Sequence, residues 1–237
     1  YAGGQVTIIH ILNVVQSFPF DFDLGFFLME PLIFIIGIYV LLAVFLWGRA
    51  IFCGWLCPFG ALQELLFKIG KLVKIPSVAL SEASTKWLTK LKYLTFIGLA
   101  GLTFYSYDLA ISGTQIEPFK TAITFRFNAP WPGLVYAILL LAIGLFVERF
   151  YCRFICPLGG GLAILGQLRL FNWLKRRPEC GNPCAQCEAV CPVGAIQRSG
   201  AIDMNECFYC LDCQVVYYND HQCPPLIALR KRGERLI

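Results

Sequence analysis

Eight of the twelve cysteines lie between Cys180 and Cys223, and their spacing limits what this part of the chain can fold into. They form two groups of three close cysteines, each with a further cysteine that precedes a proline, at Cys191-Pro192 and Cys223-Pro224. A Cys-x2-Cys-x2-Cys-x3-Cys-Pro run is the bacterial pattern for a [4Fe–4S] cluster, and in two-cluster proteins the fourth cysteine ligates the other cluster. The pattern therefore predicts two clusters with exchanged fourth ligands.

The exchange assigns four cysteines to each cluster. One set is Cys180, Cys184, Cys187 and Cys223, and the other is Cys207, Cys210, Cys213 and Cys191. Two gaps are longer than the pattern, before Cys184 and before Cys223. They bear on the exchange of fourth ligands but not on the cluster count, since eight cysteines remain. Two zinc sites of four cysteines each are the alternative. Three close cysteines together with a distant Cys-Pro are typical of iron–sulfur clusters and not of zinc sites. The short, metal-type spacings also disfavour a framework of disulfide bonds.

The rest of the chain is strongly apolar. Charged residues make up 15% of the sequence, against about 25% in soluble domains. Three stretches approach the roughly 20 apolar residues that a membrane span needs. They are residues 24–47, 91–111 and 129–147. The sequence thus predicts an α-helical membrane protein with about three transmembrane helices, interfacial helices and a C-terminal cytoplasmic two-cluster ferredoxin-like domain.

This fold class implies three parts. They are an outer-surface lead-in segment (1–23), a membrane domain (24–174) and the ferredoxin-like domain (175–237).

Lysine and arginine are dense in the predicted loops on either side of the second and third spans, but only Lys120 and Arg126 lie between those spans. Cytoplasmic loops carry the excess of basic residues. We therefore expect a multi-pass membrane protein with a cytoplasmic cysteine unit. The net charge of +5 follows from this asymmetry and does not indicate nucleic-acid binding.

A short motif occurs twice, as "FCGWLCPFG" at 52–60 and "YCRFICPLG" at 151–159. Each copy is a Cys-x3-Cys-Pro pair followed by an apolar run with helical spacing, which predicts a helix on the membrane surface. Proline suits the first turn of such a helix. Two copies that leave the membrane on the same side would place the cysteine pairs near each other.

We expect the four cysteines of the two copies to converge on one redox-active site, either a metal centre or reversible thiol pairs. These cysteines are Cys53, Cys57, Cys152 and Cys156. Residues i and i+4 share a helix face if the helix continues through the pair. Nearby Arg49, Arg149 and Arg153 are expected to favour the thiolate form. Separate buried thiols, packed as small apolar side chains, are the alternative.

Several stretches resemble the C-terminal half of the NosR family, membrane iron–sulfur flavoproteins of nitrous-oxide respiration. They are "WGRAIFCGWLCPFGALQELL", "EPFKTAITFRF", "ERFYCRFICPLG", "RLFNWLKRRPECGNPC" and "HQCPPLI". The resemblance covers nearly the whole chain and extends to NirI and NapH. It implies electron transfer in denitrification, between cytoplasmic clusters and a periplasmic flavin and nitrous-oxide reductase system. It also implies a covalently attached FMN, on an outer domain that this sequence does not include.

Partners follow from the same resemblance. They are the lipid bilayer, the periplasmic nitrous-oxide reductase system and a cytoplasmic electron donor that the sequence does not name. The oligomeric state is open, with a homodimer as one alternative. No catalytic acid pair, nucleophile set or phosphate loop stands out, so we expect an electron-transfer component and not a stand-alone enzyme. Two other hypotheses are a redox-sensing regulator of nitrous-oxide reductase gene expression and a NapH-like quinol dehydrogenase subunit.

Overall fold

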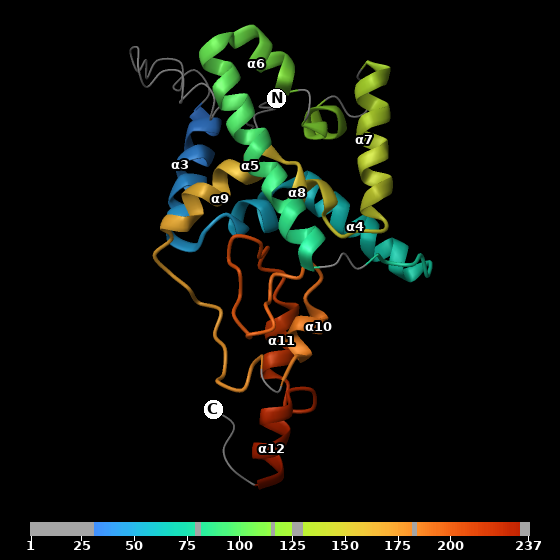
Figure 1. Cartoon of the computed structure of the whole chain (residues 1–237), viewed down its shortest axis with the longest axis vertical. Helices are drawn as coiled ribbons and strands as arrows, with labels where there is room; N and C mark the ends of the chain where they lie inside the picture. Colours follow the sequence, from blue (N-terminus) through green and yellow to red (C-terminus); the bar gives the residue numbers. More distant parts are fainter. Residues whose placement is uncertain (1–30, 79–81, 115–116, 125–129, 182–183, 233–237) are drawn as a thin grey trace.

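The computed structural model describes residues 31–78, 82–114, 117–124, 130–181 and 184–232. The predicted lead-in segment, 1–23, lies outside the described residues, as does the start of the first predicted span. Figure 1 shows the helices of the first two thirds of the chain gathered at one end of the molecule. The cysteine unit lies at the other end and finishes in α12.

The described residues are mainly helical. The first part contains α3 (Pro31–Trp47), the π-helix η1 (Phe52–Leu56), α4 (Pro58–Leu72), α5 (Glu82–Tyr105), α6 (Tyr107–Gly113), the π-helix η3 (Lys120–Thr124), α7 (Trp131–Gly144), α8 (Phe150–Phe154), α9 (Pro157–Leu165) and the 3-10 turn η4 (Gly166–Leu168). The cysteine unit contains α10 (Gln186–Val190), α11 (Asp212–Tyr218) and α12 (Pro224–Arg232). Helix α5 packs against α6, α8 and α9, α4 packs against α7, and α10 packs against α11.

The three expected transmembrane helices are not observed in the part of the chain that the structure describes. Helices α3 and α7 have 17 and 14 residues, fewer than the roughly 20 that cross a bilayer. Helix α5 has 24 residues, but Lys86, Lys90 and Lys92 lie in its first half. Within the described residues no helix is both long and apolar enough to cross a membrane, so the predicted membrane-spanning fold is wrong.

Each repeated motif turns sharply between its cysteines and its proline. Pro58 begins α4 and Pro157 begins α9, as expected for proline in a first turn. Cys57 and Cys156 are the N-cap residues, with ψ of 110° and 112°. The helix therefore does not continue through either pair, because the residue before a proline avoids helical backbone. The condition under which the two cysteines of a pair would share a helix face is not met.

The two motif helices have different environments. Helix α4 exposes apolar side chains, among them Leu65 and Leu72, as a surface helix does. Helix α9 is instead buried from Pro157 to Ala163, so the prediction of a second surface helix is wrong. Its glycines allow the close packing, because a Cβ on Gly160 would overlap the backbone of α5. The "GGG" run after Pro157 marks a tight helix crossing.

A buried charge cluster joins the helices to the cysteine unit. The carboxylate of Glu206 pairs with Lys92 of α5, and one of its oxygens lies 3.5 Å from Nη2 of Arg49. Lys92 and Arg49 are 0% and 1% exposed. Buried charges are stable only when they are paired, so Glu206 supplies a counter-charge that two buried cations share.

Replacing Glu206 by glutamine is expected to destabilise the protein by about 3–5 kcal/mol, because it leaves buried cations without a counter-charge. Denaturant unfolding of the purified protein measures the loss. Asp220, whose ion-pair partners among the described residues are the exposed His221 and Arg230, provides the matched control. Asp220→Asn should cost about 1 kcal/mol or less. Equal losses of unfolding free energy in the two variants would show that the buried charge cluster stabilises the protein no more than an exposed ion pair does.

Candidate metal centre

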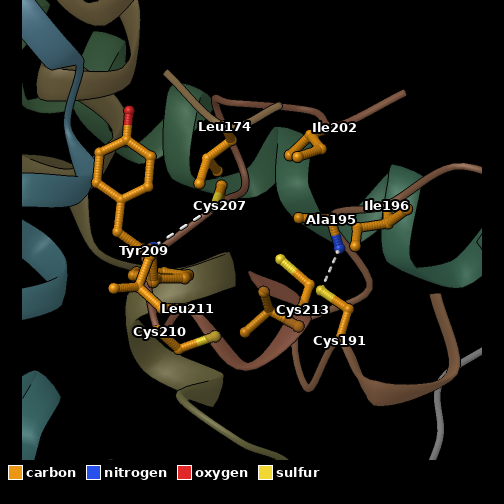
Figure 2. A pocket seen from close by; sticks show the side chains of 12 residues that line it. Leu174, Cys191, Ala195, Ile196, Ile202, Cys207, Tyr209, Cys210, Leu211 and Cys213 are labelled. Atoms are coloured by element: carbon orange, nitrogen blue, oxygen red, sulfur yellow. Dashed lines mark hydrogen bonds between the residues drawn. The ribbon is translucent and has the colours of Figure 1, made fainter. Parts of the chain in front are cut away.

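One cavity of the cysteine unit is lined by the four cysteines of the second predicted set, Cys191, Cys207, Cys210 and Cys213. Figure 2 shows these four around the cavity, with Leu174 and Ile202 among its other walls. The remaining lining is apolar or aromatic and includes Val193, Ala195, Ile196, Phe208, Tyr209 and Leu211. Cys191 comes from the end of α10, whereas the other three surround the start of α11. The structure thus brings together all four cysteines that the exchange rule assigned to this cluster.

Local backbone conformation turns the close cysteines toward the cavity. Tyr209 and Leu211 have φ of 53° and 68°, so the chain curls between Cys207 and α11. The backbone N–H of Tyr209 donates to Sγ of Cys207 at 3.4 Å, and that of Ala195 donates to Sγ of Cys191 at 3.3 Å. Hydrogen bonds to ligand sulfurs are one means by which proteins tune iron–sulfur clusters.

Burial raises the pKa of the Cys207 thiol to about 11 and that of Cys210 to about 12. Iron ligation overcomes this cost, because a coordinating thiol is deprotonated outright. Binding must then release protons. Retention of iron by this site should therefore fall at low pH.

A second cavity is lined by Cys180, Cys184 and Cys187 of the first predicted set. Arg176 also lines it, and its buried guanidinium has no nitrogen or oxygen partner among the described residues. A cluster with four thiolate ligands is negatively charged and would supply that partner. The donor set and the orphaned cation both fit an iron–sulfur cluster.

Cys223, the fourth cysteine assigned to this set, does not line the second cavity. It is buried, and its sulfur accepts a hydrogen bond from Nη1 of Arg177 at 3.4 Å. The two cavities are neighbours, because Sγ of Cys187 lies 3.5 Å from the carbonyl oxygen of Cys213. Among the described residues no three cysteine, histidine or acidic side chains are placed to share one metal ion. In a [4Fe–4S] cluster each thiolate binds a different iron, so the four cysteines stand farther apart than the ligands of a single metal ion.

The two repeated motifs meet at a third cavity. Cys57, Cys152 and Cys156 line it, together with Phe52, Phe59, Glu117, Phe119, Tyr151 and Leu158. Cys53 is buried in the same core as Cys152. The two copies are in direct contact, because a Cβ on Gly60 of the first would lie 3.7 Å from Sγ of Cys152 in the second. The hydroxyl of Tyr151 is buried there and has no partner among the described residues.

The expected thiolate form of these four cysteines is not supported. Burial raises the pKa of Cys57 to about 11, and it also raises the pKa values of Cys53, Cys152 and Cys156. Arg149 donates instead to the carbonyl oxygen of Cys53 at 2.8 Å and pairs with Glu64. Desolvation outweighs the nearby arginines, because a thiolate without metal or close pairing is costly in an apolar core.

The first motif also forms a docking surface for the cysteine unit. The ring of Phe208, which lies between cluster cysteines in the sequence, is flanked by Arg49 and Arg149 with centroid distances of 4.6 and 5.0 Å. Gly54 lies against the backbone of Phe208 so closely that a Cβ there would overlap the carbonyl group. The indole N–H of Trp55 donates to the carbonyl oxygen of Tyr209 at 3.2 Å. The pair Cys53/Cys57 and the loop Cys207–Cys210 are therefore held together.

Sequence reasoning did not identify Phe208, Gly54 or Glu206 as site residues. One signal was available, since among the positions at which the two motifs differ, one exchanges the smallest residue for a long side chain. Gly54 of the first copy corresponds to Arg153 of the second. A glycine where its repeat has a long side chain suggests close backbone approach.

Cys191→Ser is expected to remove the cluster held by Cys207, Cys210 and Cys213, or about four irons per chain, and to spare the other. The reason is that Cys191 lines the same cavity as those three cysteines. Iron, acid-labile sulfide and EPR of the reduced protein measure the outcome. Cys223→Ser is the comparison, and it should affect the Cys180 set. Loss of the same cluster in both variants would refute the assignment of Cys191 and Cys223 to different clusters. Zinc in stoichiometric amount would refute the presence of iron–sulfur clusters.

Three cysteine-lined cavities on a helical scaffold define the class as an iron–sulfur protein of a ferredoxin-like kind. Comparison with known families agrees. The model named "4Fe-4S binding domain" matches residues 29–76 and 129–178, which contain the two motifs, and the model named "NosR" matches residues 178–234. The chain belongs to the NosR family, and the predicted resemblance is confirmed. It is an iron–sulfur protein of the NosR type, with regions similar to the 4Fe-4S binding family.

Individual relatives give the extent of the similarity. The regulatory protein NosR of Stutzerimonas stutzeri is 48% identical over 99% of this chain, which spans 32% of that protein. A regulatory protein NosR of Pseudomonas aeruginosa is 60% identical over 35% of this chain and 85% of its own length. The protein NirI of Paracoccus denitrificans is 45% identical over 94% of this chain and 33% of its own length. The chain thus spans about a third of the length of two of these relatives. No solved structure matches it.

Proposed function

We propose that this chain is an electron conduit that joins two [4Fe–4S] clusters in residues 175–237 to a redox centre at the four motif cysteines. When bound, the clusters supply one-electron carriers. The protein holds their ligand sets beside each other and beside the motif pairs. It also covers them with apolar side chains that keep water away. The contact of Phe208 with Gly54 is the observation that carries this proposal, because it joins a cluster loop to the Cys53/Cys57 pair.

The motif cysteines are the proposed second redox site. Three of them, Cys57, Cys152 and Cys156, line a small cavity with the hydroxyl of Tyr151, which has no partner among the described residues. All four lie in the regions that match the 4Fe-4S binding family. Cys53, Cys57, Cys152 and Cys156 would hold a metal or form reversible thiol pairs there. A buried set of raised-pKa thiols suits a metal better than free thiolates, since the metal itself removes the protons.

The cellular setting proposed here follows the family. The conduit would serve nitrous-oxide respiration, exchanging electrons with a periplasmic nitrous-oxide reductase system and an FMN-bearing domain. We propose that it works at the bacterial inner membrane with its cysteine unit on the cytoplasmic face. Exposed apolar side chains on α3, α5 and α7 support contact with lipid, among them Ile35, Phe104 and Ile138. Large exposed apolar surfaces mark membrane or protein contacts.

Regulation is the second candidate function, because the similar NosR proteins carry the name "regulatory protein". A redox sensor would use the same clusters to report the state of the cytoplasm. Direct contact with nucleic acid is not part of either proposal. The two functions differ in what fails when a cluster is lost: electron supply to the reductase, or production of the reductase.

Cys210→Ser, placed in the protein that contains this chain and expressed in a denitrifying host, separates them. Electron supply predicts that nitrous-oxide consumption stops while the amount of reductase, measured by immunoblot, is unchanged. Regulation predicts that the reductase itself disappears. His221→Ala, a change at an exposed side chain of the same unit, should leave both measurements as in the parent. Normal nitrous-oxide consumption by Cys210→Ser would refute the conduit.

A further inference from the structure

A cavity of about 690 Å³ opens between the helices and the cysteine unit. Its volume lies in the range of sites for small molecules and cofactors, about 300–1,000 Å³. Its walls come from α4, the start of α5, the turn before α8, α8 itself and the segment that follows α10. No part of the electron path proposed above uses this space.

The charged lining of this cavity is mainly basic. Four cations from different elements line it, namely Lys71, Lys86, Arg153 and Arg198. They face the carboxylates of Glu148 and Glu188. Burial raises the pKa of Glu148, which disfavours its negative charge. Excess positive charge in a concave site attracts and holds anions.

One of these cations has an unused donor. Arg153 is 6% exposed, and its Nη2 donates to the carbonyl oxygen of Val193 at 2.7 Å. Its Nε is buried and has no hydrogen-bond partner among the described residues. A buried donor of this kind costs free energy unless something accepts its hydrogen bond. Arginine is well suited to phosphate, because its planar guanidinium donates to two oxygens at once.

The other walls supply apolar surface and a connection to the metal site. Phe67, Val78 and Phe146 line the cavity, which suits a flat ring or an acyl chain. Cys191 lines both this cavity and the one formed with Cys207, Cys210 and Cys213. A molecule bound here would therefore lie beside a cluster ligand.

We propose that this cavity binds a phosphate-bearing anion, supplied either by a free nucleotide or by the head group of an anionic phospholipid. The basic side chains and the free Nε of Arg153 bind the phosphate, and the apolar wall receives the remainder of the molecule. Exposed Leu72 at the end of α4 and Val73 directly after it, next to Lys71, make a lipid source compatible with the geometry. The proposal does not depend on the electron conduit, since it concerns binding alone.

FMN and phospholipid vesicles are the two probes. Equilibrium dialysis of FMN against the purified chain with its clusters measures nucleotide binding, and inorganic phosphate is added as a competitor. Sedimentation with phosphatidylglycerol or phosphatidylcholine vesicles measures binding to a head group. The test variant is Lys71→Glu/Lys86→Glu. Its matched control, Lys74→Glu/Lys90→Glu, makes the same charge change at exposed lysines outside the cavity.

Saturable FMN binding that phosphate displaces, and that the test variant weakens about tenfold or more while the control does not, supports a nucleotide source. No FMN binding, with phosphatidylglycerol binding weakened about tenfold by the test variant alone, supports a lipid source. Arg153→Gln should weaken whichever probe binds. The proposal is overturned if the test and control variants behave alike with both probes. It is also overturned if FMN binds but phosphate does not compete.

Discussion

Cys57→Ser/Cys156→Ser is expected to stop electron transfer to the nitrous-oxide reductase system completely, while the EPR signals of the C-terminal clusters remain. Both cysteines line the cavity where the two motifs meet. Serine removes the sulfur that a redox centre needs. It leaves the fold intact, because both positions are helix N-caps and serine is among the best N-cap residues. Sγ of Cys156 already accepts a hydrogen bond from the N–H of Gly159 at 3.3 Å, which a serine hydroxyl can replace.

The measurement is nitrous-oxide consumption by a denitrifying host that carries the variant, together with EPR and thermal unfolding of the purified protein. Leu56→Ser, a change at an exposed neighbour of Cys57, is the control and should retain electron transfer. Normal nitrous-oxide consumption by the double variant would show that the motif pairs are structural. Loss of the C-terminal cluster signals would show that the pairs act through folding.

Gly54→Ala is expected to loosen the contact between the first motif and the cysteine unit. Any Cβ at this position overlaps the carbonyl group of Phe208, and neither backbone can move freely. Phe208 is buried between Arg49 and Arg149, and Gly54 lies within the π-helix η1. Overpacking of this kind typically costs about 1–3 kcal/mol. Electron transfer should fall as well, because the variant separates a cluster loop from the Cys53/Cys57 pair.

Gly98→Ala is the matched control for this substitution. Gly98 lies in α5, and a Cβ there has no neighbour within 4 Å. Alanine favours the helix by roughly 1 kcal/mol over glycine, so the control should be neutral or stabilising. Denaturant unfolding and the rate of nitrous-oxide consumption compare the two variants. If Gly54→Ala matched Gly98→Ala in both, the docking contact would not matter to stability or to function.

Local sequence chemistry predicted part of the fold correctly. Pro58 and Pro157 begin helices where expected, because proline restricts its own backbone and that of the residue before it. The spacing around Cys207, Cys210 and Cys213 likewise predicted a set that lines one cavity, since short loops bring close cysteines together. Helix length was harder to predict. An apolar stretch sets no end point, and α3, α5 and α7 each end or acquire charge before a span is complete.

The sequence by itself determined that this is an iron–sulfur protein of the NosR type, because cysteine spacing and the duplicated Cys-Pro motif are local patterns. Only the tertiary structure decided which distant groups meet. It packed Gly54 on Phe208, enclosed Glu206 with Arg49 and Lys92, and buried α9 against α5. It also buried the motif thiols so deeply that desolvation outweighs the effect of the arginines on their pKa. A pKa and a docking contact depend on burial and on residues far apart in the chain, and burial is a property of the packed molecule.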